Sequence, residues 1–364
     1  MYCCAECFGD RSLTRDIIPM RSTGLGDCFY CGTENTAVVV PAQISEFFEL
    51  LVSAYKRDDQ GNVLVEWFRE DWGLFRHPRM DNNRASDLLA EILSDSELVA
   101  QTFSPAYEVD GSPLDEWEKL RDELMFHNRF FPDARIDLIW LERLLVSLSV
   151  DSSEVPSVWY RARIQSEEAP YSLAQMGAPP SKFASYGRAN PAGIPYLYLG
   201  STESTAISEV RPHTGEIACV VDFRIPVDLE LIDLRRPRRP ISPFFLEDGA
   251  DICKLRGYLP LLDRLGEELT RPVLPRSAAI DYTPSQYLCE FIKKSGYQGV
   301  LYSSSVGAGM NLALFDPRCA NAGVVTQYRV VRVSVEIESK GAWQRAVQLS
   351  HRKSLSLVAS DNAR

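Results

Sequence analysis

Apolar residues at helical spacing dominate the first half of the chain. Apolar side chains at positions i, i+3, i+4 and i+7 fall on one face of a helix. Residues 43–55 follow this spacing with Ile44, Phe47, Phe48, Leu51 and Val52. The same spacing predicts three more helices, over residues 85–99, 114–126 and 136–148. We therefore expect residues 37–150 to form an all-α helical domain, with the very apolar segment 136–148 at its centre.

After residue 158 the pattern changes to short runs of β-branched and aromatic residues, which are typical of strands. These runs predict strands over residues 158–164, 196–199, 217–225, 229–234, 299–303, 312–315 and 328–337. Helical spacing returns at about residues 202–210, 250–267 and 284–295. The mixture predicts an α+β domain over residues 151–340, which starts at a linker-like segment. A tail over 341–364 follows, and we expect it to be disordered from about residue 345.

The composition suits a globular protein of several domains. The chain has 364 residues, of which 45% are hydrophobic and 24% are charged, enough for two or three domains with cores. Its net charge is −11. Nucleic-acid binders usually carry a basic face, so this balance counts against a nucleic-acid partner. We interpret the dense basic cluster, which Pro237 interrupts, as a solvated loop rather than a phosphate site; it consists of Arg235, Arg236, Arg238 and Arg239.

The sequence gives no sign of a membrane or secreted protein. No stretch approaches the roughly 18 consecutive apolar residues of a membrane helix, so we expect no membrane partner. The N-terminal residues MYCCAECFGDRS lack the basic-then-apolar order of a secretion signal. We therefore expect a cytoplasmic protein. In that compartment cysteines stay reduced, and an organised cysteine set is more typical of a metal site than of disulfides.

Two Cys-x₂-Cys pairs stand within residues 1–36, separated by 20 residues: Cys4 with Cys7, and Cys28 with Cys31. Each pair presents two thiolates, and two pairs complete a tetrahedron around one zinc ion. A segment with so few core-forming residues would also need such a metal to fold. We therefore expect a closed, structural Zn²⁺ site, a zinc knot, in which Cys3 could replace Cys4. Unrelated buried cysteines and a redox pair are the alternatives.

Near the end of the helix expected over 114–126, Arg121 and His127 have an Arg-x₅-His spacing. This spacing resembles the motif of the helical HEPN ribonucleases, in which the histidine would serve as acid or base. The motif consists of two residues only. A histidine held by structural contacts is therefore the favoured interpretation.

Polar residues of the C-terminal half stand where strands and turns meet. Arg161 lies in a strand of bulky residues. The glycine-rich loop over 187–193 offers Arg188 and Asn190, whose guanidinium and amide suit phosphate or ribose oxygens. In the strand that follows, alternation places the tyrosines on one face and the leucines on the other; these are Tyr196, Tyr198, Leu197 and Leu199.

The helix expected over 202–210 places Glu209 on the same face as Ala206 and Val210. A carboxylate that faces inward is costly unless it is paired or functional. We expect Arg161 or Arg188 to be its partner. Farther on, the strand over 299–303 runs into three serines and a glycine-containing loop, an arrangement that is as common in ligand sites as in plain turns.

Six fragments in this order resemble the RES domain, a family named after its arginine, glutamate and serine. They are Tyr-Arg at 160–161, Gly-Arg-x-Asn-x-x-Gly at 187–193, Tyr-Leu at 198–199, Ala-x-x-Glu-Val at 206–210, Gly-Val-Leu-x-x-Ser at 299–304 and Asn-Leu-x-Leu-Phe at 311–315. The resemblance covers about residues 158–316. The cysteine pairs and the helices after them are similar to the HEPN/RES-like N-terminal region of longer RES proteins.

This resemblance implies an ADP-ribosyltransferase-like fold and cleavage of NAD⁺, as substrate, at the nicotinamide–ribose bond. By position, Arg161, Glu209 and Ser304 match the family's catalytic residues, and Ser303 is the other choice for the serine. The implied substrate-binding residues are Tyr160, Arg188, Asn190, Tyr198, Ser303 and Asn311. The loop departs from the family pattern at Ala189, where the family usually has tryptophan.

Family members are often toxins held by a partner antitoxin, and some transfer ADP-ribose to inorganic phosphate. The resemblance therefore implies an NAD⁺ phosphorylase or glycohydrolase with NAD⁺, phosphate and an antitoxin or other regulatory protein as its partners. Glu209 would stabilise the positive charge that builds on the ribose, while Arg161 and Arg188 bind the diphosphate. The alternatives are transfer of ADP-ribose to a protein, RNA cleavage through Arg121 and His127, and a binding module without activity.

Overall fold

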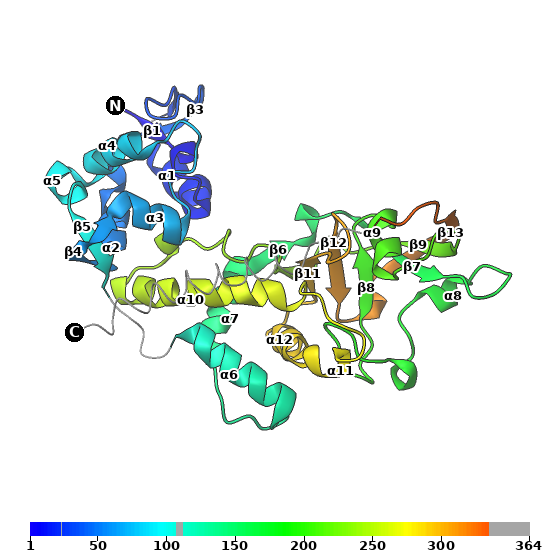
Figure 1. Ribbon diagram of the computed structural model, residues 1–364. Coiled ribbons are helices and arrows are strands. Elements are labelled where there is room, and N and C mark those ends of the chain that lie inside the picture. Colours follow the sequence, from blue (N-terminus) through cyan, green and yellow to red (C-terminus); the bar gives the residue numbers. More distant parts are fainter. Residues whose placement is uncertain (23, 107–111, 335–364) are drawn as a thin grey trace.

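The computed structural model describes residues 1–22, 24–106 and 112–334, so the expected tail over 341–364 lies outside the described residues. An N-terminal group of elements and a large C-terminal sheet lie at opposite ends of the view in Figure 1. One long helix, α10 (Gly249–Glu268), runs between them. In the described part of the chain, no helix is both long enough and apolar enough to cross a membrane.

The cysteine-rich segment forms a small antiparallel sheet with the strand order β1–β3–β2. Its strands are β1 (Cys3–Cys4), β2 (Gly24–Gly26) and β3 (Thr36–Val39). A short helix, α1 (Ile18–Arg21), packs against β3. β3 is the central strand and pairs with both β1 and β2, so the small sheet extends to Val39, beyond the expected boundary of the segment at residue 36.

Residues 37–150 are mainly helical, as the apolar spacing predicts. The helices are α2 (Ser45–Val52), α3 (Leu64–Trp72), α4 (Asn82–Leu93), α5 (Ser96–Val99), α6 (Pro113–Phe126) and α7 (Leu138–Leu148). The predictions over 114–126 and 136–148 agree closely with α6 and α7. The helix expected over 85–99 is divided, because Ser94 adopts a left-handed conformation with φ 53° and ends α4.

The expectation of an all-helical region is wrong in one respect. Two strands, β4 (Tyr55–Val63) and β5 (Thr102–Pro105), pair antiparallel in this region. Polar residues occupy most of β4, and its register is irregular between Arg57 and Asn62. This strand therefore carries little of the regular alternation by which strands are recognised in a sequence.

The main sheet has eight strands in the order β13–β9–β7–β8–β12–β11–β10–β6. All neighbours are antiparallel except β10 and β11. The strands are β6 (Ser149–Asp151), β7 (Val158–Ile164), β8 (Leu197–Gly200), β9 (Ile217–Arg224), β10 (Glu230–Asp233), β11 (Gly299–Ser303), β12 (Met310–Leu314) and β13 (Asn321–Arg329). The predicted strands correspond to β7–β12, whereas β13 begins earlier than the strand expected over 328–337, whose end lies outside the described residues.

Four helices besides α10 belong to the C-terminal half: α8 (Leu173–Met176), α9 (Glu203–Glu209), α11 (Ala278–Asp281) and α12 (Thr283–Lys294). The helices predicted at 202–210, 250–267 and 284–295 correspond to α9, α10 and α12. The predicted alternation in β8 is confirmed. Its leucines pack in the core of one sheet face, and Tyr196 and Tyr198 pack on the other face.

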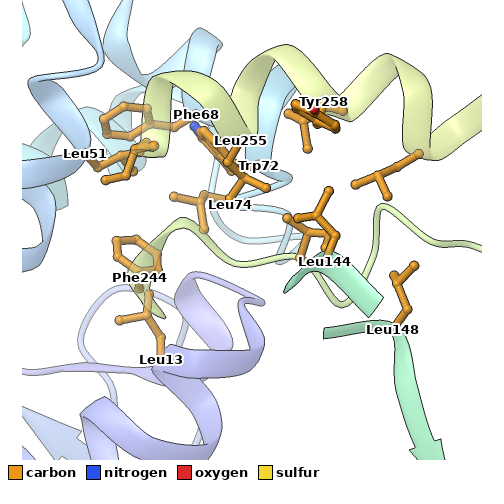
Figure 2. Packing of buried hydrophobic residues seen from close by; sticks show 14 of the residues in the cluster. Leu13, Leu51, Phe68, Trp72, Leu74, Leu144, Leu148, Phe244, Leu255 and Tyr258 are labelled. Atoms are coloured by element: carbon orange, nitrogen blue, oxygen red, sulfur yellow. The ribbon is translucent and has the colours of Figure 1, made fainter. Parts of the chain in front are cut away.

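One hydrophobic core connects the two ends of the molecule through α10. The cluster that contains the cysteine-rich segment also contains α10, α12 and one face of β11 and β12. Figure 2 shows Leu255 and Tyr258 of α10 in this cluster together with Trp72 and Leu74 of the N-terminal group. The N-terminal group and the main sheet therefore share a core and do not form separately packed bodies.

We expect Leu255→Ala to lower the free energy of unfolding of the whole chain by about 2–5 kcal/mol, because it leaves a cavity in the shared core. Leu255 is fully buried, whereas Leu274 is 59% exposed. Leu274→Ala is therefore the matched control and should cost less than about 1 kcal/mol. Urea unfolding followed by circular dichroism measures both variants, and equal losses would contradict the shared core.

Candidate active site

A cavity of about 360 Å³ lies at the central strands of the main sheet, among β7, β8, β11, β12, helix α9 and the loop before β8. This volume falls in the range of small-molecule sites, roughly 300–1,000 Å³. Six of the nine catalytic and substrate-binding residues expected from the sequence line it: Tyr160, Arg161, Arg188, Tyr198, Glu209 and Asn311. A seventh, Ser304, contacts one of these residues directly.

Two hydrogen bonds hold the carboxylate of Glu209 at the cavity. Its Oε1 accepts from Ser304 Oγ at 2.7 Å and from Asn311 Nδ2 at 2.7 Å. The expected pairing with Arg161 or Arg188 is wrong, because no ion pair among the described residues involves Glu209. Both donors are neutral. They orient the carboxylate and leave its negative charge available to a cationic group in the cavity.

Ser304, and not Ser303, faces Glu209. Side chains alternate between the two faces of a strand. Tyr302 lines the cavity, and Ser303 therefore points to the opposite face and lines a different cavity. Regular pairing of β11 ends at Ser303, so strand alternation in the sequence could not fix the position of the serine that follows.

Strand β7 brings Arg161 to the site. β7 and β8 pair only between Tyr160 and Gly200. Arg161 Nη1 donates to the carbonyl of Tyr198 at 3.4 Å, and its buried Nε has no partner among the described residues. Burial, with a smaller contribution from Arg163, lowers the pKa of Arg161 to about 10. Its guanidinium therefore stays charged at neutral pH and keeps an unsatisfied donor, a combination that favours an anionic ligand.

Arg188 reaches the cavity from the loop before β8 and is fixed at both ends of its guanidinium. Nη1 donates to the carbonyl of Arg271 at 2.8 Å, and Nη2 donates to Ser305 Oγ at 3.3 Å. The guanidinium carbon also lies 5.4 Å from the ring centroid of Tyr282, within the range of a cation–π contact. These contacts fix the orientation of the guanidinium and leave some of its five N–H donors for a ligand.

Asn190 does not line the cavity, although the sequence suggested a substrate-binding role. Its side chain is buried, and its Oδ1 accepts from the hydroxyl of Tyr198 at 2.7 Å. Its Nδ2 donates to the carbonyls of Ser185, Pro191 and Ile194. All of these contacts lie inside the protein, so Asn190 shapes the loop that carries Arg188.

The hydroxyl of Tyr198 is the second fixed point of this loop. It accepts from the backbone N–H groups of Ala189 at 3.0 Å and Asn190 at 3.2 Å. At Gly187, a Cβ would lie 2.5 Å from both Asn190 Oδ1 and the Tyr198 hydroxyl, so only glycine fits. The glycine and the asparagine of the Gly-Arg-x-Asn pattern therefore fix the shape of the loop. Within this pattern, only the side chain of Arg188 points into the cavity.

Sequence reasoning missed three tyrosines that line the cavity: Tyr186, Tyr282 and Tyr302. Tyr302 could have been found, because it is paired with Asn311 across β11 and β12 and must share its face. Tyr282 follows α11 and is far from the other site residues in sequence, so no local signal points to it. These rings give the cavity aromatic walls.

Two residues that line the cavity carry a buried polar atom without a hydrogen-bond partner in the described part of the chain. Besides Arg161 Nε, the side-chain oxygen of Asn311 is buried and has no hydrogen-bond partner among the described residues. An unsatisfied buried group costs about 1–3 kcal/mol. A polar ligand that reached either atom would recover part of that cost.

The four predicted metal ligands come together in the N-terminal segment: Cys4, Cys7, Cys28 and Cys31. All are buried, and their Sγ atoms lie within 4.8 Å of one another. Cys3 lies outside this group, because its Sγ contacts the carbonyl of Val39 at 3.7 Å. Four mutually close thiols are the donor set of a tetrahedral metal site, so these residues could hold a metal ion.

Arg121 and His127 do not form a common site. Arg121 Nε lies 3.3 Å from the buried carboxylate of Glu268 on α10. The side chain of His127 is 68% exposed and lies 3.3 Å from Asp122. Neither residue lines the cavity described above. Arg121 is therefore engaged in a packing contact between helices, which favours the structural interpretation of this motif.

Comparison with known proteins identifies the C-terminal half. A family model described as the RES domain matches residues 158–334. A chain from the solved structure of the M. tuberculosis MbcT–MbcA toxin–antitoxin complex is similar at 14% identity, with a TM-score of 0.30. The similarity covers 52% of this chain and 91% of that chain. No curated protein matches the sequence.

We expect Tyr198→Phe to lower the free energy of unfolding by about 1–3 kcal/mol, because it leaves buried partners of the hydroxyl unpaired. Tyr186→Phe is the matched control, since Tyr186 lines the same cavity but is 45% exposed. Urea unfolding of both variants measures the difference. If Tyr198→Phe were as stable as the control, the hydroxyl would not be holding the loop.

Proposed function

Because residues 158–334 of this chain are a RES domain, we propose that the protein cleaves NAD⁺ at the nicotinamide–ribose bond. The observation that carries this proposal is the carboxylate of Glu209, oriented by Ser304 and Asn311 at the edge of an aromatic-lined cavity. Loss of nicotinamide builds positive charge on the ribose. A preorganised carboxylate beside that ring lowers the free energy of the transition state.

The two arginines of the cavity supply the complementary charge for the other half of the substrate. Arg161 retains an unsatisfied Nε donor, and Arg188 is held by Arg271 and Ser305. Guanidinium groups bind phosphate oxygens with strong, charge-assisted hydrogen bonds. We assign the diphosphate of NAD⁺ to these residues, and the ribose and nicotinamide to the tyrosine-lined part of the cavity.

In this reaction the bond between the nicotinamide nitrogen and the ribose C1″ breaks, and nicotinamide leaves with the bonding electrons. An oxygen of the acceptor then bonds to C1″. With inorganic phosphate the product is ADP-ribose 1″-phosphate, and with water it is ADP-ribose and a proton. We favour a small acceptor, inorganic phosphate or water, over a protein acceptor. We assign the sheet to the ADP-ribosyltransferase-like fold because an arginine, a tyrosine and a glutamate surround one cavity on its central strands.

Purified protein should release nicotinamide from NAD⁺, and Glu209→Gln should lower the rate about 10²–10³-fold, the usual cost of removing one well-placed electrostatic group. Chromatography of the reaction with and without inorganic phosphate measures the rate and identifies the acceptor. Glu203→Gln is the control, because Glu203 lies on the same helix but does not line the cavity.

Equal rates for Glu209→Gln and the wild-type protein would overturn the assignment of Glu209. Labelled ADP-ribose recovered on protein, with little free product, would replace a small acceptor with a protein acceptor. RNA decay that requires His127 but not Glu209 would instead support the helical region as a ribonuclease.

For the cysteine group we propose one structural Zn²⁺ ion. The support is the donor set: four buried thiols, mutually within 4.8 Å, with every position supplied by protein. Such a closed site leaves no coordination position for a substrate. When bound, the ion would hold together a segment whose only sheet is three short strands, and it would take no part in NAD⁺ cleavage.

Freshly purified protein should contain about one zinc ion per chain, and Cys28→Ser should lose most of it, because three thiolates bind zinc much less tightly than four. Cys319→Ser is the control, since Cys319 lies outside the group. Elemental analysis measures the content. Protein that contains no zinc, and takes up none when zinc is added, would contradict the proposal.

A further inference from the structure

A second cavity, of about 1,000 Å³, lies between the cysteine-rich segment and the main sheet. Its walls come from residues 6–15, the segment from the end of α7 to Glu154, residues 233–240, Ser201 and the turn over 303–310. It shares no lining residue with the cavity that contains Glu209. We call it the arginine cleft, after the five arginines in its lining: Arg11, Arg15, Arg235, Arg236 and Arg239.

Two of the five arginines are neutralised by carboxylates of the same cleft. Arg235 makes a bidentate contact with Asp233, with a shortest distance of 2.6 Å. Arg15 lies 3.6 Å from Glu154. These two pairs contribute no net charge to the cleft.

The other two carboxylates of the cleft do not pair with arginines in the described part of the chain. Asp10 is buried and accepts from the backbone N–H of Leu13 and from Ser242 Oγ, both at 3.0 Å. Burial raises its pKa above the ordinary value for aspartate. Glu6 is exposed. It is therefore the one carboxylate of the cleft lining whose negative charge can offset the arginines that have no ion pair among the described residues.

Three arginines keep an unneutralised charge at the cleft. Arg11 donates to a neutral acceptor, the carbonyl of Ser147, at 3.3 Å. Arg236 and Arg239 are exposed, and their side chains have no hydrogen bond or ion pair among the residues that the structure describes. Positive charges gathered in one cavity repel one another, and a bound anion would relieve this repulsion. The cluster stands out because the chain as a whole carries a net charge of −11.

The turn that presents these arginines is held by hydrogen bonds, although the side chains of Arg236 and Arg239 are exposed, as expected of a solvated loop. The N–H of Arg239 donates to the carbonyl of Arg236 at 3.0 Å. Between them, Arg238 donates to the carbonyls of Glu70 at 2.6 Å and Asp71 at 2.9 Å in the N-terminal group. A pinned backbone lowers the entropy lost when the arginine side chains bind a ligand.

We propose that the arginine cleft binds a small phosphate-bearing molecule through Arg11, Arg236 and Arg239. Its volume is at the upper end of small-molecule sites, roughly 300–1,000 Å³, and arginine is the side chain best suited to phosphate groups. A long nucleic acid would be repelled by the net negative charge of the chain. This site lies beyond the proposed NAD⁺ cleavage and does not depend on it.

Isothermal titration of the full-length protein with ATP and, separately, with inorganic tripolyphosphate tests the site. Arg236→Gln and Arg239→Gln should each weaken binding about tenfold or more, the usual effect of losing one charge-assisted hydrogen bond. Arg318→Gln is the control with the same charge change, because the Arg318 side chain is 90% exposed and pairs only with Asp316 in the described residues. Equal binding of both probes assigns recognition to the phosphates, and tighter ATP binding adds the nucleoside; either result supports the site.

Three results would overturn the proposal. Equal weakening in all three variants would mean nonspecific attraction to charge. Binding that survives both cleft substitutions but is lost in Arg161→Gln would place the probes in the other cavity. Binding of a short RNA oligonucleotide, with neither small probe bound, would make the cleft a nucleic-acid surface. Unfolding curves of each variant ensure that a loss of binding is not a loss of fold.

Discussion

Helix α10 supplies apolar residues to a core that neither end of the molecule could complete alone. Ile252, Leu255 and Leu262 belong to the same cluster as residues of the cysteine-rich segment, of α12 and of the inner face of β11 and β12. Burial of apolar surface contributes about 25 cal/mol per Å², so separating the N-terminal group from the sheet would expose α10 and lose this contribution. Residues 6–15, which form one wall of the arginine cleft, are held against the main sheet through this shared core.

The C-terminal end of α10 adds a polar constraint to the apolar one. The carboxylate of Glu268 is fully buried and is contacted by Arg121 and Arg264, at 3.3 Å and 3.0 Å, and by the indole N–H of Trp117. A buried charge is tolerated only when it is paired and hydrogen-bonded. One turn later, the carbonyl of Arg271 accepts from Arg188. The helical N-terminal region is therefore linked to Arg188 of the candidate active site through Glu268 and the backbone of Arg271.

The sequence predicted best what depends on local periodicity. The range of β7, the two faces of β8 and the inward direction of Glu209 all follow from periods of 2 or 3.6 residues. Contacts between distant segments were missed or misassigned: Glu209 bonds to Ser304 and Asn311 instead of an arginine, and Tyr282 reaches the cavity from another helix. The contacts that Asn190 makes within the protein could not be predicted for the same reason. A polar residue in a glycine-rich loop has the same local signature whether it binds a ligand or closes the loop.

Alternation within one strand pair also explains how two cavities of different character come to share a wall. Tyr302 pairs with Asn311 and faces the candidate active site, while their neighbours Ser303 and Met310 also pair and face the arginine cleft. The turn that joins these strands carries Ser304, which holds Glu209, and Gly309, where a Cβ would lie 2.0 Å from Thr205 Oγ1. So close a contact with α9 leaves the turn little room to move toward the helix. A displacement of the turn toward the arginine cleft would instead draw Ser304 away from the carboxylate that it orients.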